Sequence, residues 1–530
     1  MPKFLFVTGG VLSSLGKGIF ASSLARLLKS RGVNVAQMKI DPYLNCDAGT
    51  LNPFEHGEVF VTRDGFECDL DLGNYERFLD VFALREQNLM MGSAYKSVIE
   101  KERRGEFLGK TMQVIPHVTN EIKRRVTRAA EVTKCDLLIV EIGGTVGDIE
   151  SEVVLEAIRQ MKFERERGEV LFVHVALLPT VTTGEEKTKP LQHSVKELLS
   201  KGISPDFIVA RSRNPIARET RDKISLFCNV PAESVFCSPD LANVYGLPVL
   251  LEGQGVAEAV AGRMGLMLGA PALGEWKKLV ERMDAAEKPL RVAVIGKYAT
   301  MRDTYASVFE ALKHAAAANG ARLEAELVDS EKIEAGTATL AGFDAVIVPG
   351  GFGERGVEGI IKAIRFAREE RVPFLGLCYG MQLAVIEYAR NVLGWSDANT
   401  TEINPKTTHP VICILPEKEG LKELGGTLRL GAYDVTVEKD TKAFEAYGSE
   451  KISKRFRHRY EVNPEHVAAL EKAGVRFSGR DPNREIMKLM ELREHPFFLA
   501  TQFHPEFDSR LGAPEPLFNA LAKAALTNKK

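Results

Sequence analysis

The sequence predicts an α/β protein with two parallel-sheet domains, and three observations carry this prediction. Its 530 residues exceed the roughly 250–300 at which a single hydrophobic core stops growing. Short apolar runs alternate with stretches of helical periodicity, a pattern typical of parallel sheets flanked by helices. Residues 269–289 interrupt this alternation with Gly, Ala, Pro and charged residues. We therefore expect domains at 1–268 and 290–530, joined by a linker with a short helix at 269–289.

Composition excludes several classes of protein. Hydrophobic residues make up 45% of the chain and charged residues 27%, which is typical of soluble globular proteins. The formal net charge of −2 argues against a nucleic-acid or membrane-surface partner. Apolar runs are too short for a membrane span. The seven cysteines are scattered without a CxxC pair, which argues against a zinc site or a disulfide framework and favours a reducing, cytoplasmic location.

The N-terminal elements predict a phosphate-binding loop. A short apolar strand at Phe4–Val7 is followed by the glycine-rich stretch Thr8–Gly18 and then by a helix. In this arrangement, backbone N–H groups and the helix N-terminus bind phosphate oxygens, and Lys17 reaches the terminal phosphates. The loop departs from the Walker A pattern, because Val11 replaces a glycine and Gly18 replaces the Ser or Thr that binds magnesium. An ordinary glycine-rich turn is the alternative interpretation.

Charged residues follow the next predicted strands. Lys39 ends the strand Val33–Ile40, and Glu141 ends the strand Asp136–Glu141; both should face the crevice at the carboxyl edge of the sheet. Asp71, on a segment expected to be extended together with Asp69, would complete a Mg²⁺ site with Glu141, because Mg²⁺ takes few protein carboxylates beside phosphate oxygens. A solvated pair of charges is the alternative.

A second lysine-rich stretch follows a later strand. Strands are predicted at Val170–Leu178 and Phe207–Ala210, and the connection between them carries the segment Lys187–His193. Its lysine, amide and hydroxyl groups are suited to a second polyanion, with Lys223 further along the chain. Each lysine alone is more commonly a solvated surface residue.

The second half restarts the alternation of strands and helices. Strands are expected at Arg291–Ile295, near Leu327 and at Asp344–Val348, and helices at roughly Asp303–Asn319 and Val357–Arg371. The glycine-rich loop 349–356 leaves one of these strands, and its amides are free to bind a substrate carboxylate.

A cysteine then lies in a strand–turn–helix setting. Pro373–Leu377 reads as the end of a buried strand, and apolar residues recur at helical spacing from Gln382. Between them lies Cys378, with Gly376 and Gly380 two positions away on either side. Such an elbow exposes a nucleophile beside helix-start amides that bind an oxyanion. A small buried cysteine is the alternative.

A base for this cysteine is predicted near the C-terminus. The segment Phe497–Phe503 is expected to be a strand, and His504 and Glu506 follow it directly. A cysteine nucleophile needs an imidazole partner, and the imidazole needs an orienting carboxylate. We therefore predict Cys378, His504 and Glu506 as a catalytic triad. A turn with no catalytic role is the alternative.

Taken together, these motifs resemble the CTP synthase family over nearly the whole chain. In the second half, the motifs that resemble a class I glutamine amidotransferase are PGGFG, GLCYGMQ and QFHPEF. In the first half, the motifs that resemble the synthetase domain are VTGGVLSSLGKGI, MKIDPYLN, HGEVFV, DLDLGNYERF, EIGGTVGDIES and GEEKTKPLQHSV. The chain departs from common family residues at Tyr379, where Leu is usual, and at Arg63, Asn74 and Thr501.

The resemblance implies roles for particular residues. ATP would be bound by Ser14, Leu15, Gly16, Lys17, Gly18, Ile19 and Asp71, with Lys17 and Lys39 assisting phosphoryl transfer and Asp71 and Glu141 holding Mg²⁺. UTP and CTP would be bound by Ser13, Asp148, Ile149, Glu150, Lys187, Thr188, Lys189, Pro190, Leu191, Gln192 and Lys223. Glutamine would be bound by Gly351, Tyr379, Gly380, Met381, Gln382, Glu402 and Arg459.

The resemblance also implies the reaction and its regulation. ATP would phosphorylate UTP at O4, and ammonia from L-glutamine would displace the phosphate to give CTP. GTP would activate the protein, CTP would inhibit it, and four copies would form a tetramer through the first domain. The alternatives are another ATP-dependent amidotransferase, such as a cobyrinic acid amide synthase, a regulatory phosphate-loop ATPase, and a filament-forming scaffold without catalysis.

Overall fold

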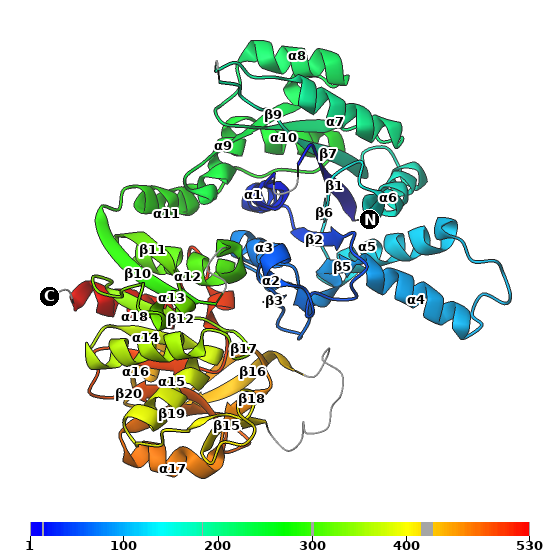
Figure 1. Ribbon diagram of the computed structural model, residues 1–530. Coiled ribbons are helices and arrows are strands. Elements are labelled where there is room, and N and C mark those ends of the chain that lie inside the picture. Colours follow the sequence, from blue (N-terminus) through cyan, green and yellow to red (C-terminus); the bar gives the residue numbers. More distant parts are fainter. Residues whose placement is uncertain (1, 13–14, 183, 298–300, 415–427, 529–530) are drawn as a thin grey trace. The chain divides into compact units, whose positions relative to one another are not determined.

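The computed structural model describes the whole chain except residues 1, 13–14, 183, 298–300, 415–427 and 529–530 (Figure 1). It divides into two compact units: unit 1 comprises Met1–Ala48 and Asp71–Val280, and unit 2 comprises Gly49–Leu70 and Glu281–Lys530. The boundary after Val280 lies inside the predicted linker. The segment Gly49–Leu70 differs from the prediction, because the sequence places it in the first domain and the structure groups it with unit 2.

Unit 1 is built on a seven-stranded sheet in which every described pairing is parallel. The strand order is β5-β2-β6-β1-β7-β8-β9. The bounds of these strands are β1 Lys3–Gly10, β2 Val35–Asp41, β5 Asn88–Met90, β6 Leu137–Ile142, β7 Val170–Leu177, β8 Phe207–Ser212 and β9 Val235–Pro239. The central strands β1, β2 and β6 are buried along almost their whole length, as expected for a sheet covered by helices on both faces.

Helices connect these parallel strands. Their bounds are α1 Lys17–Ser30, α3 Asp71–Leu79, α4 Met91–Arg103, α5 Thr119–Thr133, α6 Glu152–Glu164, α7 Lys189–Ser200, α8 Arg218–Cys228, α9 Leu247–Gly253 and α10 Val256–Met264, with α11 Gly274–Asp284 at the boundary. The apolar sides of α5 and α6 pack with β2, β6 and β7 in one core, and α7 and α8 pack with β7 and β8 in another.

Unit 2 contains a nine-stranded mixed sheet of order β11-β10-β12-β13-β21-β20-β19-β16-β17. Its parallel part consists of β10 Lys288–Gly296, β11 Ala321–Asp329, β12 Ala345–Val348, β13 Phe374–Leu377 and β21 Phe498–Thr501. Its antiparallel part consists of β16 Arg429–Val437, β17 Lys451–His458, β19 Val475–Arg480 and β20 Met487–Leu492. The predicted α/β class is confirmed, and the antiparallel strands are an addition to the predicted parallel sheet.

Two helical layers enclose this sheet (Figure 1). One layer contains α12 Ala306–Ala318 and α18 Pro516–Thr527, and the other contains α14 Val357–Glu369 and α15 Tyr379–Asn391. The smaller elements of unit 2 are α2 Pro53–His56, β3 Phe60–Val61, β4 Glu67–Cys68, α13 Ser330–Glu334, β14 Asn399–Thr400, β15 Pro410–Ile414, α16 Lys442–Tyr447, β18 Tyr460–Val462, α17 Pro464–Lys472 and a 3-10 turn at Pro505–Asp508. Among the described residues, no helix has the length and apolarity needed to cross a membrane.

Candidate functional site

Cys378 occupies the predicted elbow between β13 and α15. The strand ends at Leu377, the helix begins at Tyr379, and Cys378 has φ 52° and ψ −98°, a conformation that non-glycine residues rarely adopt. A Cβ added at Gly376 would lie 2.9 Å from the carbonyl carbon of Gly380. The two glycines therefore allow the tight strand-to-helix turn that presents the thiol.

The predicted base follows the neighbouring strand. Leu377 of β13 is aligned with Thr501 of β21, so Cys378 and His504 both follow strands that end at the same edge of the sheet. His504 Nδ1 lies 2.7 Å from Glu506 Oε1. The carboxylate thus fixes the ring so that Nε2 is the nitrogen available for chemistry.

The electrostatic setting of His504 favours the imidazolium. Burial alone would lower its pKa, but the charges of Glu506 and Cys378, together with the hydrogen bond to Glu506, raise the pKa of His504 to about 10. Cys378 Sγ lies 3.6 Å from the carbonyl oxygen of Arg457, and Gln502 Nε2 donates a hydrogen bond to it at 3.6 Å. The predicted nucleophile, Cys378, is therefore held beside a ring whose raised pKa favours the charged form and beside an amide donor.

This raised pKa predicts how stability depends on pH. A folded-state pKa above the ordinary value of about 6.5 stabilises the fold fully below pH ~6.5, and the effect is lost as the pH rises through about 10. Glu506→Gln removes a carboxylate that raises this pKa, so the variant should lose less unfolding free energy between pH 7 and 10 than the wild type. Urea unfolding across this range measures the difference. Glu471→Gln changes an exposed position on α17 and should behave as the wild type. If the unfolding free energies of wild type and Glu506→Gln changed equally with pH, Glu506 would not be the cause of the raised pKa of His504.

A small cavity opens at the reacting groups. Its volume is about 100 Å³, and its lining includes Cys378, His504, Gly350 and Gly351. A Cβ at Gly350 would lie 2.8 Å from His504 Cε1, so the glycine-rich loop after β12 approaches the ring as only glycine allows. A larger hollow of about 760 Å³ in unit 2 is lined by Arg459, among other residues. The smaller cavity is the one lined by Cys378 and His504, the predicted nucleophile and base.

Tyr379 braces the glycine-rich loop. Its hydroxyl donates to the Gly353 carbonyl at 2.6 Å, and Lys297 Nζ lies 4.5 Å from the centre of its ring. The N–H of Gly353 donates to Glu402 Oε1 at 3.0 Å. Burial raises the pKa of Glu402, and the positive charge of Arg459 lowers it. The two residues, both predicted to bind glutamine, are therefore close enough to interact electrostatically.

The remaining predicted glutamine residues begin α15. Gly380, Met381 and Gln382 lie in its first turn, where the N–H groups of Met381 and Gln382 donate to the Cys378 carbonyl at 3.1 and 3.3 Å. Gln382 Nε2 donates to the Tyr460 carbonyl at 3.1 Å. The side chain of Gln382 thereby ties the helix start to β18.

In unit 1 the predicted phosphate loop follows β1. Ser13 and Ser14 lie outside the described residues. Val11, where the Walker pattern has glycine, adopts φ 80°, a conformation that glycine takes readily and β-branched residues rarely do. Gly16 caps α1 with φ 82°, and Lys17, its first residue, donates from Nζ to the Gly144 carbonyl at 2.7 Å.

Lys39, Asp71 and Glu141 meet beside this loop. Lys39 of β2 is aligned with Glu141 of β6; its Nζ binds Asp71 Oδ2 and lies 3.3 Å from Glu141 Oε1. Tyr75 donates to Glu141 Oε2 at 2.6 Å. Burial, followed by the charge of Asp71, raises the pKa of Glu141. The predicted extended setting of Asp71 is wrong, because this residue begins α3.

The structure explains why glycine follows Lys17. A Cβ at Gly18 would lie 2.6 Å from Asp71 Oδ1 and 3.2 Å from Glu141 Oε2. The two carboxylates therefore converge where a Walker Ser or Thr would project, and they fit a divalent cation. Mg²⁺ is usually bound by one or two protein carboxylates, and oxygen ligands from phosphate and water would complete its shell.

The predicted UTP and CTP residues lie in two stretches of unit 1. Asp148, Ile149 and Glu150 are exposed after β6, and Asp148 accepts a hydrogen bond from the N–H of Thr145 at 2.8 Å. In the second stretch, Lys187 lies 2.6 Å from Glu185 and lowers the pKa of that carboxyl, as does the charge of Lys223. These lysines therefore approach one carboxylate, as ligands of one polyanion would.

The start of α7 carries the other residues of this set. Lys189 and Pro190 begin the helix. Gln192 Nε2 donates to Thr188 Oγ1 at 3.0 Å. Leu191 is buried in the core of unit 1, so only its backbone is available to a ligand.

Several site residues were not predicted. Gln502 belongs to the QFHPEF motif, and the sequence indicates no role for it, although its Nε2 donates to Cys378 Sγ. His174 is buried between Thr8 Oγ1 at 2.9 Å and Ser194 Oγ at 2.8 Å, and burial lowers its pKa to about 3. It links the strand before the phosphate loop to α7. A lone histidine within an apolar strand carries no sequence signal of this kind.

Comparison with known proteins finds a matching protein family for each half of the chain. The family model described as CTP synthase N-terminus matches residues 3–266, and that described as glutamine amidotransferase class-I matches residues 300–524. A CTP synthase of Pelotomaculum thermopropionicum is 52% identical over 533 residues, which cover 100% of this chain and 99% of the relative. One of Pyrococcus abyssi is 52% identical over 534 residues with the same coverage. The solved Trypanosoma brucei CTPS glutaminase domain with bound acivicin is 40% identical, over 46% of this chain and 95% of that chain, with a TM-score of 0.43.

Proposed function

The chain belongs to the CTP synthase family, and from this premise we propose that unit 1 activates UTP with ATP while unit 2 releases ammonia from glutamine. As a member of this family, the chain is a glutamine-hydrolysing C–N ligase that makes CTP from UTP. The observation that supports the division of labour is that each unit contains a reactive cluster of its own. Cys378 lies with His504 and Glu506 in unit 2, and Lys17 lies near Asp71 and Glu141 in unit 1.

Glutamine hydrolysis is assigned to unit 2. Cys378 Sγ attacks the side-chain amide of glutamine, His504 donates a proton to the departing nitrogen, and water cleaves the thioester to give glutamate. The backbone N–H of Tyr379, the residue that directly follows Cys378, is proposed to stabilise the oxyanion. Gly351, Glu402 and Arg459 are proposed to hold the amino-acid end of the substrate.

UTP activation is assigned to unit 1. The γ-phosphoryl group of ATP transfers to O4 of UTP, which leaves ADP and 4-phosphoryl-UTP; ammonia then adds to C4, and phosphate departs with the original O4. Lys17 and Lys39 neutralise charge on the transferring group. When bound, Mg²⁺ supplies further neutralisation of the phosphate oxygens, and Asp71 and Glu141 would hold it. Lys187, Lys189 and Lys223 are proposed to bind the triphosphate of UTP.

Regulation and assembly are proposed from the family resemblance. GTP would activate glutamine hydrolysis, and CTP would inhibit through the segment 148–150. Four copies would assemble through unit 1, and the scattered cysteines favour a cytoplasmic location. All seven cysteines are free thiols in the structure, which is compatible with such a location.

The 4-phosphoryl-UTP step has a direct test. UTP labelled with heavy oxygen at O4 is incubated with the full-length protein, ATP, Mg²⁺ and either glutamine or ammonium chloride. We expect the label in inorganic phosphate, in equal amount to the CTP formed, with both nitrogen sources. Mass spectrometry of the phosphate gives the result; label released to water instead would contradict phosphorylation at O4.

A further inference from the structure

Strand β17 passes both reacting side chains of unit 2. The carbonyl oxygen of Arg455 accepts a hydrogen bond from the backbone N–H of His504 at 2.8 Å. Two residues later, the carbonyl oxygen of Arg457 lies 3.6 Å from Cys378 Sγ. The backbone of β17 therefore contacts His504 through Arg455 and Cys378 through Arg457.

The side chains of the same two arginines hold residues 49–70. Arg455 Nη1 donates to the Val61 carbonyl at 2.9 Å, and Arg457 Nε donates to Glu67 Oε1 at 2.8 Å. A Cβ at Gly49 would lie 2.2 Å from Glu67 Oε2, so glycine there leaves space for this carboxylate. The segment belongs to unit 2 in space, although the CTP synthase N-terminus model covers it in sequence.

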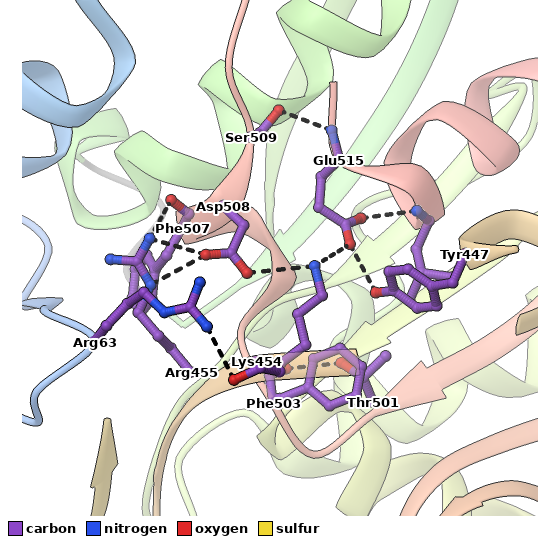
Figure 2. Close-up of polar contacts among 12 residues, drawn as sticks. Arg63, Tyr447, Lys454, Arg455, Thr501, Phe503, Phe507, Asp508, Ser509 and Glu515 are labelled. Carbon is purple, nitrogen blue, oxygen red and sulfur yellow. Dashed lines mark hydrogen bonds and ion pairs between the residues drawn. The ribbon is translucent and has the colours of Figure 1, made fainter. Parts of the chain in front are cut away.

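Arg455 is fully buried and completely engaged. Its side chain is 0% exposed; Nη2 donates to the Phe507 carbonyl and to Asp508 Oδ1, both at 2.9 Å (Figure 2). Its guanidinium also lies 5.0 Å from the ring centre of Phe60. Burying a charge is costly unless it is paired and hydrogen-bonded, so these partners define one position for the arginine and hence for its carbonyl.

Aromatic contacts connect the catalytic ring to the same segment. The His504 ring stacks on Phe507 at 5.2 Å with an interplanar angle of 13°, and Phe507 meets Phe60 edge-on at 4.8 Å. The plane of the imidazole is thereby fixed by a residue that packs on β3. Arg63 Nη2 donates to Ser453 Oγ at 2.9 Å. This is a third bond from the segment to β17, and it lies two residues before Arg455.

We infer that Arg455 and Arg457 are positioning residues for glutamine hydrolysis, anchored by the segment 49–70 through Val61, Glu67 and Phe60. The first half of the chain thus supplies part of the support of the glutamine site. This inference rests on the proposed roles of Cys378 and His504. A misplacement of reacting groups by about 1 Å can cost on the order of 100-fold in rate, so loosening one anchor should be visible in turnover.

Glu67→Gln in the full-length protein tests the anchor. The amide keeps the shape of the carboxylate and removes the charge-assisted bond to Arg457. We expect kcat for glutamine hydrolysis to fall about tenfold with KM changed less than about twofold, because Glu67 supports Arg457 at the cavity and is not itself one of the cavity's lining residues. Ammonium-dependent CTP formation, which needs no Cys378, should be unchanged. Combining Glu67→Gln with Arg457→Lys should cost less than the product of the two single losses.

The alkylation rate of Cys378 by iodoacetamide provides a second readout. The rate is measured by mass spectrometry between pH 6 and 10, and its pH profile should shift in Glu67→Gln. A contact that only stabilises the fold would leave the profile unchanged. Arg63→Gln is the matched control and should retain the wild-type turnover and profile. Wild-type behaviour of Glu67→Gln, or equal losses with glutamine and ammonium, would overturn the inference. Failure of the proposed function would instead show as glutamine-dependent synthesis surviving Cys378→Ala.

Discussion

Cys378→Ala should abolish glutamine-dependent CTP formation and leave ammonium-dependent formation intact. Sγ is the only atom at the elbow that can form the thioester, and removal of a nucleophile from such a unit costs on the order of 10⁴-fold or more in turnover. Ammonium chloride supplies the product of glutamine hydrolysis directly, so the chemistry assigned to unit 1 continues. Chromatographic measurement of CTP with each nitrogen source gives the ratio.

Cys413→Ala is the matched control for this experiment. Cys413 lies half-buried on β15 in the same unit, and its loss should leave both activities at the wild-type level. Loss of both activities in Cys378→Ala, with the fold intact by circular dichroism, would show that the thiol serves the synthetase reaction too. Retention of both would remove Cys378 from the mechanism.

The elbow and the base could be predicted because their signals are local. Gly376 and Gly380 frame Cys378 within five residues, and His504 and Glu506 are two positions apart. Parallel-sheet topology then requires loops after adjacent strands to share an edge, and β13 and β21 are adjacent. Short-range sequence patterns and one topological rule thus lead to the candidate site.

The support of this site could not be predicted, for a physical reason. The bond between Arg457 and Glu67 joins residues 390 positions apart, and an arginine on an exposed-looking strand carries no sign of its partner. Lys454 and Arg455 give β17 the composition of a solvated edge, yet both are buried among carboxylates. The antiparallel strands β16, β17, β19 and β20 were not predicted, because the polar composition of such strands does not show that they are buried in a sheet.

Gly18→Ala should strongly reduce CTP formation with both nitrogen sources. The new methyl group would lie 2.6 Å from Asp71 Oδ1, closer than carbon and oxygen tolerate, and 3.2 Å from Glu141 Oε2, a tight contact. The Asp71 carboxylate must therefore shift. Since Asp71 and Glu141 are both proposed to hold the Mg²⁺ that accompanies ATP, we expect kcat to fall by about 100-fold or more. Basal glutamine hydrolysis in unit 2, measured as glutamate release without nucleotide, should be unchanged.

Gly262→Ala is the matched control, because this glycine lies within α10 of the same unit and nothing is within 4 Å of the Cβ it would gain. It should keep both activities. Gly18→Ala with wild-type synthesis would mean that the Asp71 carboxylate can shift without consequence, which is incompatible with a cation that Asp71 and Glu141 share. The residual activity of Gly18→Ala provides a second measurement, which is the Mg²⁺ concentration needed for half-maximal ammonium-dependent synthesis. If this concentration rises while the dependence on ATP is unchanged, the defect lies at the carboxylates. Glycine would then be required at position 18, in place of the Walker Ser or Thr, because Asp71 and Glu141 converge there.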